Sequence, residues 1–258
     1  TGSLVIGGAG KLGNGSNVYA GAIANETTLT YSSSATQTLS GAISGAGAVV
    51  KDTDASALTL SGTNTFSGDL TINLGTVNVT GTLAAGVDVV VADAAAIYAV
   101  SASDTINSLT VGAAGKAQLD SGQTLTIAAT SAIAGIVQGD GNLSITGGTT
   151  TLSAANTYAG TTTIAAGATI LIDGGGKLGN GSNVYAGAIS NAGTLDYDST
   201  ANQTLSGIIS GAGALTITGS GTGALTLTGA NTFSGAIDMD TGSLVIGGAG
   251  KLGNGSNV

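Results

Sequence analysis

Apolar and polar residues alternate along many short stretches of the chain, with a period of two. Typical stretches are Leu58-Thr59-Leu60, Leu125-Thr126-Ile127 and Leu225-Thr226-Leu227. Strict alternation of this kind predicts half-buried β-strands, with apolar side chains on one face and Thr, Ser or Asn on the other. Clusters of Gly, Asn and Ser separate the stretches, and no stretch convincingly shows the spacing of an amphipathic helix. We therefore predict an all-β chain built from many short strands.

Long repeats are superimposed on this short pattern. Residues Thr1–Val18 are identical to residues Thr241–Val258, and their last eight letters, KLGNGSNV, occur once more from Lys177. A match of eighteen residues indicates a period of 240 residues, followed by the start of the next period. We therefore expect the chain to come from a tandem array.

A second motif occurs three times within the period and has the form L-x-x-x-N-T-[FY]-[SA]-G-x-x-x-[IM]-x-x-G. It predicts three related modules, at about 1–84, 85–176 and 177–240, with 241–258 beginning the next period. The motif gives these candidate structural residues: the asparagines Asn64, Asn156 and Asn231, the aromatics Phe66, Tyr158 and Phe233, and the closing glycines Gly75, Gly167 and Gly242.

A tandem array restricts the possible all-β architectures. A closed barrel cannot be extended by another copy, whereas a solenoid can. We take one coil as roughly 20 residues, with two or three short strands and corners rich in Gly or Asn. A strand spacing of about 4.8 Å then gives roughly 12 coils and about 55–60 Å per period. The predicted fold is a right-handed parallel β-helix that runs continuously over residues 1–258 as a tandem-repeat rod.

The repeated motif resembles the passenger-associated transport repeat of bacterial autotransporters. The residues that carry the resemblance are LTGANTFSGAIDMDTGSL, from Leu227 to Leu244, and their two relatives. The resemblance implies a parallel β-helical passenger that is exported by type V secretion to the outer surface of a Gram-negative bacterium. In that family such repeats usually form stalks and adhesive passengers.

The motif residues also have predicted roles within a coil. The asparagines are expected to turn inward and to hydrogen-bond the backbone at corners, as Asn does in tight turns. The aromatic residue two positions later has the same side-chain parity and is expected to fill the core. The closing glycines are expected to permit close turning without a clash of Cβ.

Composition and charge narrow the possible functions. The chain has a net charge of −9 and lacks His and Cys, and its five cations are lysines scattered along the sequence. Nucleic-acid binding requires clustered cations, so we expect no nucleic-acid partner. The longest apolar stretches are interrupted by Asp88 and Asp93, so no part of this segment is expected to span a membrane.

The candidate chemical motifs each have a simpler structural interpretation. Gly8–Gly13 matches G-x-G-x-x-G, but no helical pattern follows it, so we predict a solenoid turn and no cofactor. The single Asp140 lacks the partner turn of a calcium site, and no metal is predicted. The pairs Asp52/Asp54, Asp196/Asp198 and Asp238/Asp240 are each expected to share an outward strand face and to keep the surface soluble.

The leading hypothesis is a non-enzymatic structural or adhesive segment of a giant secreted or cell-surface protein. It would form a stiff rod or extracellular fibre for attachment or for cell–cell and matrix contact, as in a biofilm. Its expected partners are neighbouring repeats of the same chain, with possible self-association into fibres. The alternative is a module that binds glycans or another surface through a flat Thr/Ser/Asn face, because Thr-x-Thr recurs at Thr149–Thr151 and Thr161–Thr163.

Overall fold

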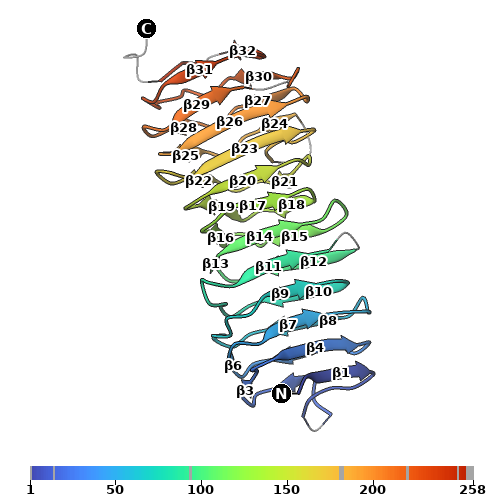
Figure 1. Cartoon of the computed structure of the whole chain (residues 1–258). Coiled ribbons are helices and arrows are strands. Elements are labelled where there is room, and N and C mark those ends of the chain that lie inside the picture. The colour runs from blue at the N-terminus through green and yellow to red at the C-terminus, as the bar shows by residue number, and fades with distance from the viewer. Residues whose placement is uncertain are drawn as a thin grey trace.

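The structure is a computed structural model that describes residues 2–13, 15–92, 95–179, 183–218, 221–248 and 250–253. These residues form one elongated stack of coils, with the two termini at opposite ends (Figure 1). The described part contains only strands, turns and irregular segments, and its strand pairs are parallel. The prediction of an all-β parallel solenoid is confirmed.

Each coil has three sides, and the chain visits them in the same order throughout the stack. We call these sides face 1, face 2 and face 3. Face 1 is a single twelve-stranded sheet, made of β1 (Leu4–Gly8), β4 (Thr28–Ser33), β7 (Ala48–Lys51), β9 (Leu70–Ile72), β11 (Asp88–Val91), β14 (Ser108–Val111), β17 (Ser131–Ile133), β20 (Thr149–Leu152), β23 (Thr169–Gly174), β26 (Thr194–Ser199), β29 (Ala214–Ile217) and β31 (Ile237–Met239).

Faces 2 and 3 are each divided into two sheets. Face 2 contains β2 (Val18–Tyr19), β5 (Gln37–Leu39), β8 (Ala57–Leu60), β10 (Gly75–Val79), β12 (Ala96–Val100), β15 (Lys116–Leu119), β18 (Ile136–Gly139) and β21 (Thr157–Tyr158), then β24 (Val184–Tyr185), β27 (Gln203–Leu205), β30 (Ala224–Leu227) and β32 (Ser243–Ile246). Face 3 contains β3 (Ile23–Ala24) and β6 (Ile43–Ser44), then β13 (Asp104–Ile106), β16 (Thr124–Ile127), β19 (Asn142–Ile145), β22 (Thr162–Ile164), β25 (Ile189–Asn191) and β28 (Ile209–Ser210).

Coil length follows from the register on face 1. The shortest described coils join Leu70 to Val89 and Ser131 to Thr150. The longest coils join Leu4 to Leu29 and Ile170 to Leu195. Both long coils contain a KLGNGSNV segment, so this repeated sequence adds about five residues to a coil of otherwise about twenty. The predicted coil of roughly 20 residues agrees with this register, and the twelve strands of face 1 enclose eleven turns, close to the roughly 12 coils predicted.

The core is a narrow channel of apolar side chains that runs along the whole stack. Strands such as β8, β16 and β30 alternate strictly between half-buried and buried positions, and Leu58, Leu125 and Leu225 are almost fully buried. Each inward side chain stacks on its counterpart in the coils above and below. Every middle coil is covered on both sides. Inward side chains therefore become exposed only towards the ends of the stack, where Leu4 is 41% and Ile246 is 41% exposed.

Candidate binding surface

The three motif asparagines lie inside the solenoid, where each replaces part of a strand. Asn64 is 1% exposed, and its Oδ1 accepts a hydrogen bond from the backbone N–H of Ile43, one coil below (3.1 Å). Its Nδ2 donates to the carbonyl of Thr82, one coil above (3.1 Å). The side chain amide therefore continues the hydrogen-bond ladder on face 3 between β6 and β13, where the described chain forms no regular strand.

The other two motif asparagines repeat this arrangement. Asn156 accepts from the N–H of Val137 (2.8 Å) and donates to the carbonyl of Lys177 (2.9 Å). Asn231 accepts from the N–H of Ile209 (2.8 Å) and donates to the carbonyl of Lys251 (2.9 Å). We call these three side chains the asparagine rungs, because each joins three consecutive coils.

The motif aromatics and glycines lie beside the rungs. Phe66, Tyr158 and Phe233 are at most 1% exposed and point into the core. The closing glycines adopt φ values of 80° (Gly75), 80° (Gly167) and 89° (Gly242), a left-handed conformation that strains other residues. At Gly75 an added Cβ would also lie 2.4 Å from the carbonyl oxygen of Asp54, in the coil below.

Two buried glutamines form a clamp that the sequence analysis did not predict. Gln37 accepts from the N–H of Leu12 and donates to its carbonyl, at 2.9 and 2.8 Å. Gln203 makes the same pair of bonds with Leu178, at 3.0 and 2.6 Å. Each clamp holds the start of a KLGNGSNV segment against the next coil. The sequence signal for these clamps is the repeated stretch QTLSG, which begins with Gln37 in one copy and with Gln203 in the other.

One buried cation was also missed. Lys51 occupies an inward position of β7 and is fully buried, with its Nζ 2.6 Å from the carbonyl of Asp54 and 5.9 Å from the ring centre of Tyr31. Burial lowers the pKa of its amine, and the nearby Asp54 and Asp52 oppose that shift. The corresponding position 166 residues later is Ile217, so only the register of the repeat could have placed Lys51 inside.

The acidic pairs differ in where they lie. Asp196 and Asp198 occupy outward positions of β26, as expected for residues two apart on a strand. The expectation for Asp52 and Asp54 is wrong. The strand β7 ends before them, and Thr53 between them has a φ of 60°, so the two carboxylates lie in a tight turn.

The outward side of face 3 is a column of hydroxyl groups. The register places hydroxyl residues directly above one another on six successive strands: Thr105, Thr126, Ser144, Thr163, Ser190 and Ser210. Neighbouring strands in a sheet are about 4.8 Å apart, so the hydroxyls repeat at about that spacing. We call this set the hydroxyl column. Of the two Thr-x-Thr stretches singled out in the sequence, Thr161–Thr163 contributes to it, whereas Thr149–Thr151 lies on face 1.

A second outward column runs beside the first and is fixed by hydrogen bonds between coils. Ser103 accepts from the N–H of Thr124 (3.0 Å), and the amide of Asn142 donates to the hydroxyl of Thr124 (3.3 Å). Thr161 then donates to Asn142 through both its backbone N–H and its hydroxyl. These bonds hold the side chains of this column in one orientation.

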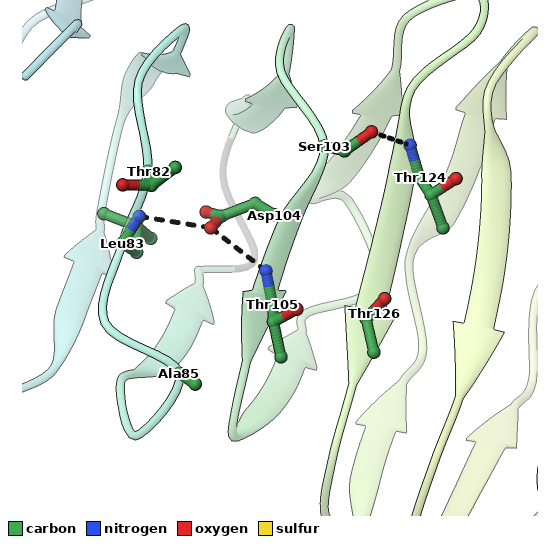
Figure 2. A pocket seen from close by; sticks show the side chains of 8 residues that line it. All are labelled: Thr82, Leu83, Ala85, Ser103, Asp104, Thr105, Thr124 and Thr126. Atoms are coloured by element: carbon green, nitrogen blue, oxygen red, sulfur yellow. Dashed lines mark hydrogen bonds between the residues drawn. The ribbon is translucent and has the colours of Figure 1, made fainter. Parts of the chain in front are cut away.

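A shallow hollow opens at the N-terminal end of the hydroxyl column. Figure 2 shows Thr105 and Thr126 lying on neighbouring strands beside Asp104, which faces the loop at Thr82 and Leu83. Asp104 is only 6% exposed, and one of its oxygens accepts from the N–H groups of Leu83 (3.1 Å) and Thr105 (3.0 Å). The other oxygen accepts from the hydroxyl of Tyr98 at 3.4 Å.

Asp104 occupies a position like that of an asparagine rung, but it carries an acid in place of an amide. Burial raises the pKa of its carboxyl above the usual 3.8, and the hydrogen bonds from Leu83, Thr105 and Tyr98 oppose that shift. The carboxylate of Asp88 is in the opposite situation, because hydrogen bonds from Ser108 and Asn107 lower the pKa of its carboxyl. The contributions of these two carboxyls to the stability of the fold therefore change with pH in opposite directions.

The surface offers hydrogen bonding more than reaction chemistry. Its exposed groups are hydroxyls and amides, which donate and accept hydrogen bonds but are weak nucleophiles without a base. Within the described ranges, no three metal-binding side chains come together, and no helix is long and apolar enough to cross a membrane.

The fold and the rungs together define a β-solenoid built from a recurring coil motif. The family model of the passenger-associated transport repeat matches residues 52–79, 147–171 and 220–246. These stretches contain Asn64, Asn156 and Asn231, so the chain carries three such repeats and the resemblance read from its motif is confirmed. No curated protein and no solved structure matches the chain significantly.

The three matched repeats do not all lie on the same faces. In the first and third, the alternating strands that bracket the motif (β8 and β10, β30 and β32) lie on face 2, with β9 or β31 on face 1 between them. In the second, the bracketing strands β20 and β23 lie on face 1, with β22 on face 3. The same motif is therefore accommodated in two orientations that differ by one face.

Proposed function

We propose that this chain is a rigid spacer within the passenger of a protein secreted to the outer surface of a Gram-negative bacterium. The observation that carries the proposal is the unbroken face 1, in which one parallel sheet of twelve strands links the first described coil to the last. A continuous ladder of backbone hydrogen bonds resists bending along the stack. The passenger-associated transport repeats support export and surface display.

The spacer does its work without catalysis. Each coil contacts only its neighbours, so added coils lengthen the rod without requiring a new fold. The rod would hold an adhesive tip away from the cell or link cells and matrix as a fibre. The 240-residue repeat of the sequence fits this role, because each unit would add about 54 Å at a strand spacing of about 4.8 Å.

The test separates length from surface chemistry. One, two and four copies of the 240-residue unit are displayed on cells beneath one fixed adhesive tip, and attachment to a ligand-coated surface is measured. A spacer predicts that attachment rises with unit number until the tip clears the other surface structures. Equal attachment at all lengths, or small-angle scattering that reports compact particles in place of rods, contradicts the proposal.

A second candidate function is recognition of a polysaccharide by the hydroxyl column. The observation that favours it is the in-register stacking of six hydroxyl residues beside a column fixed by hydrogen bonds. A glycan chain lying along the rod could exchange hydrogen bonds with successive coils.

The test compares two quadruple variants on a glycan array. The variant T105A/T126A/T163A/S190A removes hydroxyls from face 3. The control T38A/T59A/N78A/Q118A changes outward residues of face 2. Recognition predicts that the first variant loses binding and the control retains it. Absence of binding by the unchanged chain, or equal loss in both variants, counts against this function.

A further inference from the structure

The two identical eighteen-residue segments lie on different faces of the solenoid. In the first copy, strand β1 lies on face 1, where Val5 is the partner of Thr30 in β4. In the second copy, strand β32 lies on face 2, where Val245 is the partner of Thr226 in β30. Val5 and Val245 are the same position of the repeated sequence, so one period carries this position onto the next face.

The registers define how far one period advances. From Leu4, successive partners on face 1 lead through Leu29 and ten further coils to Ile237 in β31, which completes eleven turns. The chain then proceeds to face 2, where Leu244 lies on Leu225. The step from Leu4 to Leu244 is therefore eleven full coils and one third of another.

The third of a turn arises in one part of the period. The first and second KLGNGSNV segments follow β1 and β23, both on face 1, and are separated by eight whole coils. The third segment follows β32 on face 2, so the 74 residues from Lys177 to Lys251 contain the extra third.

A following unit could continue the stack without a defect. In the first copy, Leu4 pairs with Leu29 in the coil above, and in the second copy, Leu244 pairs with Leu225 in the coil below. The repeated strand therefore uses one edge in each copy. A strand in the middle of an array could form both pairings at once. The apolar side chains at the two ends agree with this. Leu4 and Ile246 are both 41% exposed, although their columns are buried inside the stack.

The same repeat motif also occurs in two orientations that differ by one face. The second passenger-associated transport repeat lies one face away from the first and third, yet its asparagine rung makes the same bonds to the coils below and above. A coil sequence can therefore be rotated by one face and keep its internal contacts.

From these observations we infer that successive 240-residue units are rotated by about 120° about the rod axis, so that three units complete a screw. This inference rests on the proposed function, in which the units follow one another in a rod. The partner of the last coil is the first coil of a second copy of the same sequence, seated one face further round. Every surface feature, including the hydroxyl column, then points in three directions along the array, and the pattern repeats after 34 coils, or about 160 Å.

The first experiment uses the chain itself, which contains no cysteine. The double variants V5C/T30C and T226C/V245C each introduce one pair on neighbouring strands, within the reach of a disulfide. Both are expected to form an intrachain disulfide on oxidation, whereas the control V5C/T226C is not. If either pair fails to fold, G7C/S32C and A224C/S243C report the same two registers. Failure of the face 2 pair in a folded chain, with success on face 1, overturns the inference.

The second experiment places the test at the junction of two units in one chain. Rotation predicts a disulfide between T226C on face 2 and V245C in the first strand of the second unit, and none between D238C on face 1 and that same second-unit cysteine. The opposite result means that units stack without rotation and overturns the inference. Scattering from the same proteins gives the rod length separately, so a compact particle would reject the spacer, whereas a rod with the unrotated cross-link would reject only the screw.

Discussion

At the scale of single residues, the asparagine rungs illustrate how a side chain can substitute for backbone. A parallel sheet loses two hydrogen bonds wherever a coil leaves its strand path, and buried backbone groups without partners are costly. The amide of Asn64 supplies one donor and one acceptor, which matches the N–H below and the carbonyl above. The amide carries its donor and its acceptor on two separate atoms of one short stem, so it can bond the coil below and the coil above at once.

Replacement of Asn64 by alanine tests this account. The variant leaves the N–H of Ile43 without its partner inside the solenoid, whereas the carbonyl of Thr82 loses the side-chain bond but keeps the bond from the backbone N–H of residue 64. An unsatisfied buried group costs about 1–3 kcal/mol, so we expect the free energy of unfolding to fall by about 1–3 kcal/mol. Chemical denaturation measures it. The control T59A shortens an outward, half-buried side chain on face 2 and is expected to change stability by less than about 0.5 kcal/mol. Equal, small effects for both variants would contradict a structural role for the rung.

Asp104 shows the effect of replacing a rung amide by an acid. Because burial raises the pKa of its carboxyl, the folded chain binds this proton more tightly than the unfolded chain does. The associated stabilisation is present at acidic pH and is lost as pH rises from the usual carboxyl pKa through the raised one. As pH rises, ionisation of this buried carboxyl therefore lowers the stability of the folded protein.

The variant D104N removes this charge and keeps the shape of the side chain. We expect its melting temperature to exceed that of the unchanged protein at pH 7, with the difference shrinking as pH falls towards 4. The comparison variant D88N should behave in the opposite way. Hydrogen bonds lower the pKa of the Asp88 carboxyl, so its charged form stabilises the fold at pH 7 and that stabilisation is lost on acidification. Because the pKa of Asp88 is lowered from the usual 3.8, its stabilisation is lost only below about pH 4, so thermal melts continued below that pH measure both variants. The same sign for the two variants would refute the interpretation.

At the scale of coils and strands, the sequence predicted most of the architecture. Period-two alternation located strands such as β8, β16 and β30, because inward residues of a narrow core must be apolar while outward residues face water. The motif spacing fixed a coil of about twenty residues. Composition alone could not assign Asp104 or Lys51 to the interior. Both look like surface residues in the sequence, and only the three-dimensional register, together with their backbone partners, brings them inside.

The KLGNGSNV segments form the element that the sequence least explained. The first two each lie in a coil that is about five residues longer than the others, which would interrupt the ladder of face 2 if nothing held the segment in place. The glutamine clamps restore the connection, since Gln203 bonds both backbone groups of Leu178 from the next coil. The start of the inserted segment is therefore held by hydrogen bonds to the next coil.

Removal of one clamp should loosen the segment without unfolding the rod. In Q203A the amide of Leu178 loses its acceptor, so we expect its hydrogen exchange to accelerate at least tenfold, while the amide of Leu125 in the middle of the stack stays unchanged. Exchange measured by NMR or mass spectrometry gives both rates. The variant Q37A provides a matched test at Leu12, where the same bonds occur. Unchanged exchange at both leucines would show that the clamps are unnecessary.

At the scale of the whole molecule, stability depends on matching registers between neighbouring coils, and this makes permissible lengths discrete. The residues around Tyr19 and Tyr185 are equivalent positions, both at the end of a short strand of face 2, and they lie eight whole coils apart. A chain that runs from residue 1 to 185 and then resumes at residue 20 therefore repeats eight coils and keeps every column in register.

This extended chain is expected to fold as a rod longer by about 38 Å, which is eight spacings of about 4.8 Å. A control that resumes at residue 30 lacks ten further residues, about half a coil, so its strands arrive on the wrong face and inward leucines meet outward positions. We expect the control to lose parallel pairing at the junction and to unfold in two separate transitions, whereas the in-register chain elongates without an added break. Small-angle scattering and calorimetry distinguish the two. If both chains form equally long and equally stable rods, stacking does not depend on register, and length in this solenoid is not counted in whole coils.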